Sequence, residues 1–459
     1  MLRLAECKRN IWLEFSAQRL ILMPAILGGI LFLVHLLNED AEILAYVESM
    51  TGRITTLYVL VVLVWGTVLV SRNINEELMQ HSWDFQRMSS LSGIEMMLGK
   101  AFGATAYAWY GGLLLIGAHI GIEIYGDIPT HIIASNVAHF LLAGMFAHAA
   151  VLLCALLMLR NPAYRAKPRG RILYSILVLA YTLPMLFMRD VYDQLETIPG
   201  DAAAEWATTT WYGITLPLES WTLISFAVFT LWVLFAAVRM MSAELQYRQT
   251  SLGWPLFLLF CIAWYGGSEW SPEDTLPIAS VPIQSYYALG ITAVGLYVSM
   301  LFDRVGIADY RKWFHAMRTR RWGDVATQIP WWLSSYILLL PSVAVALYYG
   351  LEGDENTKHA WQFAGLLLAV TSRDIALYHA LAFAGMRRLL GSFLVYLAML
   401  YVLVPLVLRE LEWEKMQALF MPVDEDSLAI TLTSFAVQAV LLTALCVWRM
   451  RRSHVEHAA

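Results

Sequence analysis

Residues 20–37 read LILMPAILGGILFLVHLL, a run that carries no Asp, Glu, Lys or Arg. About 20 helical residues of this kind cross the roughly 30 Å hydrocarbon core of a bilayer. Apolar blocks of similar length recur along the whole chain. The repetition predicts an all-α polytopic integral membrane protein rather than a soluble protein with a single anchor.

The overall composition agrees with this prediction. Of the 459 residues, 59% are hydrophobic and 15% are charged, whereas soluble domains contain about 45–50% apolar and about 25% charged residues. A soluble chain of this composition could not cover its surface with polar groups, which excludes soluble enzymes and DNA-binding proteins. The four cysteines do not form a disulfide framework either, because Cys154, Cys261 and Cys446 lie inside apolar blocks.

We expect about twelve transmembrane helices. The predicted spans are 20–37, 54–70, 103–121, 132–158, 172–188, 221–238, 253–270, 284–302, 331–350, 360–383, 391–408 and 428–448. The polar segments between them are short, and none is long enough to hold a nucleotide-binding domain.

The charges of these polar segments predict the orientation. With both termini placed in the cytoplasm, the inner segments hold 26 of the 31 Lys and Arg residues, and the outer segments hold 24 of the 36 Asp and Glu residues. Short loops on the cytoplasmic side of a membrane are enriched in Lys and Arg. We therefore expect a multi-pass protein of the cell inner (plasma) membrane with cytoplasmic N- and C-termini.

The first 19 residues resemble an amphipathic helix. Apolar side chains such as Ile11, Trp12 and Phe15 form one stripe, and Lys8 and Arg9 supply charge. Such a helix lies in the plane of the interface. It either moves with the first span as an elbow helix or is an ordinary lead-in; we favour the elbow helix.

The segment between the second and third predicted spans, 71–100, reads SRNINEELMQHSWDFQRMSSLSGIEMMLGK. Trp83, Phe85, Met88 and Leu91 recur at near-helical spacing, which predicts a short helix with an aromatic ridge on the cytoplasmic side. Exposed aromatic patches usually mark a partner surface. The alternative is that the rings fold back onto the ends of this chain's own helices. The pair Ser92-Gly93 should end the helix.

This arrangement resembles the transmembrane permease subunit of ABC transporters of the ABC-2 type. The amphipathic start, the short outer loop after the first span and the segment 71–100 carry the resemblance. In that family an acidic stretch, a coupling helix that crosses the ATPase and a Gly-Lys pair follow one another between spans two and three. Here Glu76-Glu77, residues 83–90 and Gly99-Lys100 occupy these places.

The resemblance implies that a separate ABC ATPase subunit binds this loop. The implied contact residues are Glu76, Glu77, Trp83, Asp84, Phe85, Arg87 and Lys100, with a second inner contact at Arg318, Arg320, Arg387 and Arg388. ATP and Mg²⁺ would be held by the ATPase, so we expect no cofactor, no metal and no catalytic residue in this chain. Besides the ATPase, the expected partner is membrane lipid; no nucleic acid is expected.

The chain divides in sequence into two predicted halves. Residues 1–240 hold the elbow helix, six spans and the coupling loop, and residues 241–459 hold the other six spans. A second basic amphipathic segment at 303–330 resembles the first 19 residues, so one chain could supply both halves as a pseudo-dimer. Assembly of two chains as a homodimer stays open.

Two other function classes remain. Twelve spans with cytoplasmic ends also suit a secondary transporter driven by an ion gradient. Against this class, the spans hold few acids suited to proton coupling, because we expect Arg373-Asp374 to lie at the inner end of a helix. A lipid-processing membrane enzyme is less favoured, because His119 and Glu123 share a helix face without a third member. The transported substrate is not indicated: lipid, peptide, glycan and drug are all compatible with the sequence.

Overall fold

The computed structural model describes residues 4–38, 42–80, 82–88, 91–159, 182, 208–267, 277–303, 306–352, 355–386, 389–420 and 428–455. The chain forms two compact units. Unit 1 comprises Met1–Thr209 and Thr215–Gln249, and unit 2 comprises Thr210–Ile214 and Thr250–Ala459. Each unit has its own hydrophobic core.

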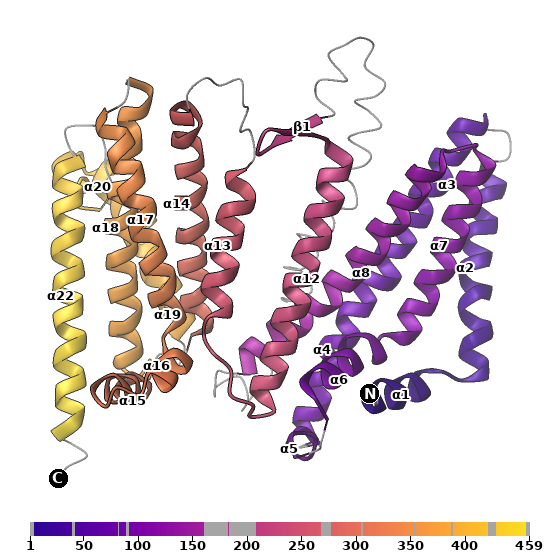
Figure 1. Cartoon of the computed structure of the whole chain (residues 1–459), viewed down its shortest axis with the longest axis horizontal. Helices are drawn as coiled ribbons and strands as arrows, with labels where there is room; N and C mark the ends of the chain where they lie inside the picture. The colour runs from indigo at the N-terminus through magenta and orange to yellow at the C-terminus, as the bar shows by residue number, and fades with distance from the viewer. Residues whose placement is uncertain are drawn as a thin grey trace. The chain divides into compact units, whose positions relative to one another are not determined.

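The described part of unit 1 is helical except for one strand pair. Its helices are α1 (Ala5–Glu14), α2 (Ala17–Leu37), α3 (Ile43–Tyr58), the π-helix η1 (Val59–Trp65), α4 (Gly66–Met79), α5 (Ser82–Arg87), α6 (Gly93–Leu98), the π-helix η2 (Gly99–Gly103), α7 (Ala106–Tyr125), α8 (Thr130–Leu159) and α12 (Leu218–Glu244). The helix α8 packs on α4 and α12, and α3 packs on α7 (Figure 1).

Unit 2 is also helical in its described part, apart from residues 210–214 at the tip of the strand pair. It contains α13 (Gly253–Gly266), α14 (Pro277–Phe302), α15 (Ile307–Arg318), α16 (Trp322–Gln328), α17 (Trp331–Glu352), α18 (Glu355–Phe383), α19 (Leu389–Ala398), the π-helix η3 (Met399–Leu403), α20 (Val404–Glu410), α21 (Glu414–Gln417) and α22 (Leu428–Val455). Figure 1 shows α14, α17, α18 and α22 running side by side, and neighbours in this series pack on each other.

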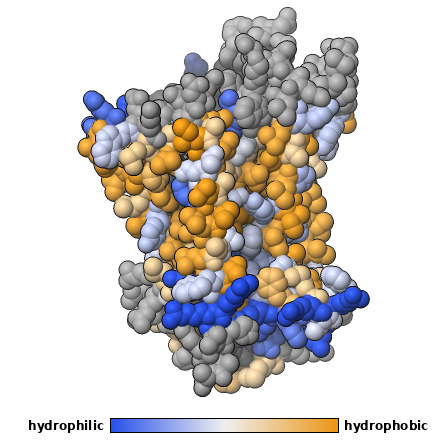
Figure 2. Space-filling model, turned by 90° about the vertical axis from the view of Figure 1, so that its left-hand side faces the viewer, coloured by the Kyte–Doolittle hydropathy of each residue, from blue (hydrophilic) through white to orange (hydrophobic). Residues whose placement is uncertain are grey.

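The structure supports a polytopic membrane protein. Within the described residues, eight helices are long and apolar enough to cross a bilayer, or up to ten if each of two bent helix pairs is one span. Their outward side chains are apolar, as Phe32 in α2 and Leu441 in α22 illustrate. Figure 2 views the face beside α22 and shows a broad hydrophobic zone. Lipid is the environment that such a surface requires.

The eight helices coincide with eight of the predicted spans, and the two bent pairs coincide with 103–121 and 284–302. The other two predicted spans have no such counterpart among the described helices. The helix α13 has only 14 residues, and the predicted span 172–188 falls outside the described residues apart from Thr182. The count of twelve, the orientation and the division into six and six spans therefore stay predictions.

The predicted outer loop 189–220 contains a hairpin in the part that is described. Strands β1 (Thr208–Trp211) and β2 (Ile214–Pro217) pair, and the two turn residues Tyr212 and Gly213 both have positive φ. Two-residue turns of this conformation match the twist of a hairpin. The β-branched and aromatic residues of this segment, such as Thr208 and Trp211, favour strands.

Candidate functional site

The second span continues well past its predicted end. The helices α3, η1 and α4 form one span candidate of 37 residues from Ile43 to Met79. At 1.5 Å per residue this is roughly 55 Å, longer than a bilayer core. Residues 71–79, which we expected to begin a loop, are helical because Ser71, Asn75 and Glu77 are buried against the protein instead of lying in solvent. Glu77 thus lies in the last turn of α4.

Two short elements follow Glu77. The helix α5 contains Ser82–Arg87, and the hydroxyl of Ser82 donates to the Glu77 carbonyl at 3.2 Å. The next helix begins after Ser92, whose hydroxyl accepts from the Glu95 amide at 3.3 Å while the Glu95 carboxylate accepts from the Ser92 amide at 3.1 Å. This is a complete capping box. It confirms the helix break predicted at Ser92-Gly93.

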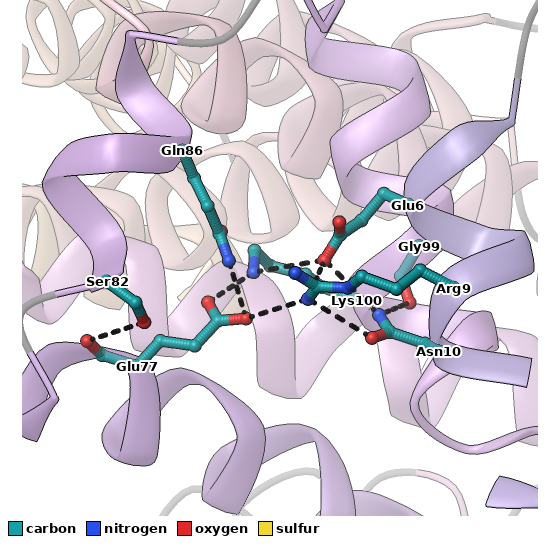
Figure 3. Close-up of polar contacts among 8 residues, drawn as sticks. All are labelled: Glu6, Arg9, Asn10, Glu77, Ser82, Gln86, Gly99 and Lys100. Carbon is teal, nitrogen blue, oxygen red and sulfur yellow. Dashed lines mark hydrogen bonds and ion pairs between the residues drawn. The ribbon is translucent and has the colours of Figure 1, made fainter. Parts of the chain in front are cut away.

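A buried ion cluster joins α1, α4 and η2, and we call it the Lys100 cluster (Figure 3). It contains Glu6, Arg9, Glu77 and Lys100. Lys100 has no exposed surface and forms an ion pair with Glu77, while its Nζ lies 3.9 Å from Glu6 Oε1. Arg9 contacts Glu6 Oε1 at 2.7 Å and Glu77 Oε1 at 3.6 Å. Lys100, Glu77 and Glu6 are buried and Arg9 is half-exposed, so two cations balance two carboxylates, as buried charges require.

The helix α1 rests on η2 because two glycines leave room for it. The side chain of Asn10 donates from Nδ2 to the Gly99 carbonyl at 3.0 Å. A Cβ at Gly99 would lie 2.4 Å from Glu6 Cγ, and one at Gly103 would lie 3.1 Å from Cys7 Cα. A side chain at either position would push α1 away. The π-helical backbone of η2 also widens the turn that carries Lys100, a feature often found at functional sites.

The helix α1 does not pack its apolar face on the rest of the protein. Glu6 and Asn10 are buried, whereas Trp12 and Leu13 are exposed. The polar face therefore binds the protein through the Lys100 cluster. The apolar residues are left outward, where an interfacial helix contacts lipid.

The aromatic ridge predicted for α5 is only partly present. Trp83 is 4% exposed, and its ring lies 5.1 Å from Lys100 Nζ. Phe85 and Met88, in contrast, are 73% and 76% exposed. Trp83 thus folds back into the core of unit 1, as in the alternative interpretation, because its ring covers a buried ammonium group. The exposed apolar surface belongs to Phe85 and Met88.

The predicted contact residues occupy different environments. Glu76 is half-buried and accepts from Arg72 Nε at 2.5 Å, while Glu77 and Lys100 are buried in the cluster. Asp84 and Arg87 belong to α5, but their side chains lie outside the described part. Of the predicted second contact, Arg318 and Arg320 are exposed at the end of α15, and Arg387 and Arg388 fall outside the described residues.

A link between α5 and the Lys100 cluster runs through one amide. Gln86 Nε2 donates to Glu77 Oε1 at 2.9 Å. Glu77 in turn contacts Lys100 in η2 and Arg9 in α1. Displacement of α5 therefore acts directly on the ends of two span candidates and on the N-terminal helix.

A second buried charge pair lies in unit 2. Arg373 has no exposed surface, and its Nε and NH2 donate to Asp374 Oδ1 at 3.1 and 2.8 Å. The hydroxyls of Tyr297 and Tyr401 donate to Asp374 Oδ2 at 2.8 and 2.9 Å. The guanidinium lies 4.6 Å from the ring centre of Phe435. Charge, hydroxyls and aromatic faces thus stabilise the pair, while Arg373 Nη1 is buried with no hydrogen-bond partner among the described residues.

The position of this pair corrects the sequence prediction. The span candidate that holds it is Gln362–Phe383, so Arg373 precedes the helix end by ten residues, or roughly 15 Å. It lies inside the span rather than at its inner end. Burial against Tyr297, Tyr401 and Phe435 allows this, because charged groups within spans face the protein interior. Arg373 therefore no longer counts among the positive charges of the predicted inner segments, on which the predicted orientation depends.

His119 and His148 are both buried and lie near polar groups, although His119 Nδ1 forms no hydrogen bond among the described residues. His119 Nδ1 lies 3.1 Å from Glu123 Oε2, and Asn136 donates to the same carboxylate. His148 Nδ1 accepts from Trp109 Nε1 at 3.0 Å, which leaves Nε2–H to donate to the Val62 carbonyl of η1 at 2.9 Å. These contacts support a packing role for both histidines.

Two members of the Lys100 cluster, Glu6 and Arg9, and the neighbouring Asn10 were missed as site residues. A sequence signal existed, because Glu6 and Asn10 share one helix face by their i, i+4 spacing. That signal indicates a polar face but not its partner.

Comparisons with known protein families, with curated proteins and with solved structures find no match for this chain.

Proposed function

We propose that the chain is the transmembrane permease subunit of an ATP-driven ABC exporter. In this proposal the membrane helices form the translocation path, and a separate ATPase subunit binds the segment that contains α5. The proposal builds on a polytopic helical protein with eight to ten candidate spans. The plasma membrane is its proposed location.

One observation carries the proposal: an exposed apolar surface is connected to the helix ends by polar contacts. Phe85 and Met88 present the surface on α5. Gln86, in the same short helix, contacts Glu77, and Glu77 contacts Lys100. A partner that binds and moves α5 would therefore pull on α4 and η2 together, which is what coupling between an ATPase and a permease requires.

The mechanism assigns separate tasks to the two subunits. ATP and Mg²⁺ bind the partner, and closure of the ATPases moves α5. The Lys100 cluster passes the displacement to α4, η2 and α1, and the helices of the permease rock between two access states. This chain performs no covalent chemistry in the proposal. A second copy or the chain's own second half would complete the path.

Co-expression tests the proposal. The chain carrying an affinity tag is expressed with candidate ABC ATPases, purified in detergent and reconstituted in liposomes. The expected result is co-purification of an ATPase whose hydrolysis is stimulated by the permease. A chain that purifies alone and transports with a proton gradient in the absence of ATP would contradict it.

A secondary transporter is the second candidate, and the Arg373–Asp374 pair is the observation that favours it. An acid inside a span, bound by an arginine and two tyrosine hydroxyls, has the composition of an ion-coupling site. A transporter of this kind needs no ATPase partner. Gradient-driven transport in the parent chain that is lost in the folded double variant Arg373→Met with Asp374→Asn would select this candidate over the first.

A further inference from the structure

The helices α15 and α16 form a corner at one end of unit 2. Residues Tyr287–Phe302 and Ile307–Arg318 meet at an angle of 112°. The helix α15 therefore runs across the direction of the preceding span candidate. A helix in this orientation next to a transmembrane helix lies along the membrane surface.

The inner face of α15 is fixed to the neighbouring helices. The Tyr310 hydroxyl lies 2.6 Å from His379 Nε2 and accepts from Trp332 Nε1 at 2.7 Å. Arg311 NH2 donates to the Met450 carbonyl of α22 at 2.9 Å. These contacts determine which side chains of α15 point away from unit 2.

The outer face of this corner combines cations and aromatic rings. Phe314 is 46% and Trp322 68% exposed. The exposed basic residues at the corner are Lys312, Arg318, Arg320 and Arg321, and none of these four has an ion-pair partner among the described residues. Arg451 and Arg452 at the end of α22 are exposed as well. Figure 2 shows a row of hydrophilic residues bordering the hydrophobic zone at the end where Figure 1 draws α15 and α16.

The turn after α15 fixes the arginines in place. The Arg320 amide donates to the Met317 carbonyl at 3.1 Å, and the Arg321 amide donates to the Ala316 carbonyl at 2.9 Å. This is the Schellman pattern, in which the residue with positive φ is usually glycine. Here that residue is Arg320, with φ of 53°. The corner thus carries a cation at a backbone position where glycine would fold more easily.

We propose that this corner, formed by α15, α16 and the turn between them, binds the headgroups of anionic phospholipids in the adjoining leaflet. The exposed arginines supply charge for lipid phosphates, and Phe314 and Trp322 insert at headgroup depth, where aromatic rings concentrate. The row of polar residues at the boundary of the hydrophobic zone favours lipid over the ATPase contact that the resemblance implies for Arg318 and Arg320.

The test uses the purified full-length chain in detergent micelles doped with either phosphatidylglycerol or phosphatidylcholine. Native mass spectrometry gives the apparent dissociation constant of each lipid. The variant is Arg320→Gly with Arg321→Gln, which removes two cations and leaves the turn intact because glycine accepts positive φ. The expected result is about tenfold or greater weakening of phosphatidylglycerol binding, with phosphatidylcholine binding unchanged.

The matched control removes two exposed arginines from the predicted outer side, Arg53→Gln with Arg409→Gln, and should keep the preference for phosphatidylglycerol. Equal lipid binding by the corner variant and this control would overturn the proposal. So would a corner variant that binds phosphatidylglycerol normally but no longer retains an ATPase, because the corner would then be a protein interface. The first of these two results does not depend on whether the exporter proposal holds.

Discussion

Lys100 in η2 and Glu77 in α4 form an ion pair from which solvent is excluded. The two residues belong to different span candidates, and each also faces α1, through Glu6 and Arg9. The four charges therefore depend on one another, so the loss of one leaves an uncompensated charge in the interior.

Removing the cation should destabilise unit 1. We expect Lys100→Met to lower the free energy of unfolding by about 3–5 kcal/mol, because Glu77 and Glu6 lose their buried partner. The added change Glu77→Gln should restore part of the loss. The midpoint of thermal unfolding in detergent measures both. Arg72→Gln, which breaks an exposed pair with Glu76, is the control and should leave the midpoint unchanged; equal midpoints for all variants would contradict the buried pair.

A methyl group at Gly99 should detach α1. Burial and the nearby Glu6 raise the pKa of the Cys7 thiol, so little reactive thiolate is present at neutral pH. In Gly99→Ala the new Cβ clashes with Glu6, α1 moves outward and the Cys7 pKa falls toward its usual value. Maleimide labelling of Cys7, in a chain whose other three cysteines are serine, should become faster. Gly28→Ala, which meets no neighbour, should not change the rate.

Trp83 and Phe85 should respond differently to truncation. Trp83→Ala removes a buried ring over Lys100 and should cost about 3–5 kcal/mol of stability. Phe85→Ala removes an exposed ring, so the fold should persist while ATPase attachment or stimulated hydrolysis decreases. Detergent-soluble yield, co-purified ATPase and ATP hydrolysis separate the two effects. Normal coupling in well-folded Phe85→Ala with Met88→Ala would exclude α5 as the coupling site.

Asp374 should be required for the stability of unit 2. Asp374→Asn leaves Arg373 with no counter-charge in a buried position, and we expect a loss of about 3–5 kcal/mol. Arg373→Met combined with Asp374→Asn should recover folded protein. Thermal unfolding of both variants checks this, with the exposed Asp309→Asn as the control. A single variant as stable as the parent would show that the pair contributes little.

Cysteine labelling tests the predicted orientation. Single cysteines at positions 201 and 355 should react with a membrane-impermeant maleimide from outside the cell, and those at positions 165 and 318 should react only after permeabilisation. The physical reason is the excess of Lys and Arg in the predicted inner segments. A reversal at any one of the four positions would refute the arrangement of spans.

The positions of most spans could be predicted from sequence because each is an apolar block of bilayer length. The break at Ser92 was also predictable, since Ser followed by Glu95 at the third position is a local capping signal. Local signals of this kind need no knowledge of the rest of the fold. They explain why helix existence was predicted better than the roles of polar residues.

Contacts between distant residues could not be predicted in the same way. Trp83 and Lys100 looked like surface residues because the loop around them is polar, but α1 and α4 bury Lys100 from two sides. Arg373 was placed at a helix end because charge is expensive in lipid. The structure instead surrounds it with Tyr297, Tyr401 and Phe435 from elsewhere in the chain, an arrangement that no local pattern encodes.

The packing of α1 on η2 has a consequence for when this contact can form during synthesis. Asn10 and its acceptor Gly99 are 89 positions apart, so at about 5–20 residues per second the ribosome takes roughly 5–20 s to make the second after the first. During that interval Glu6, Arg9 and Asn10 have no partner from η2 and can contact α1 itself, water or lipid headgroups. The helix α1 is therefore made well before the part of η2 on which it packs.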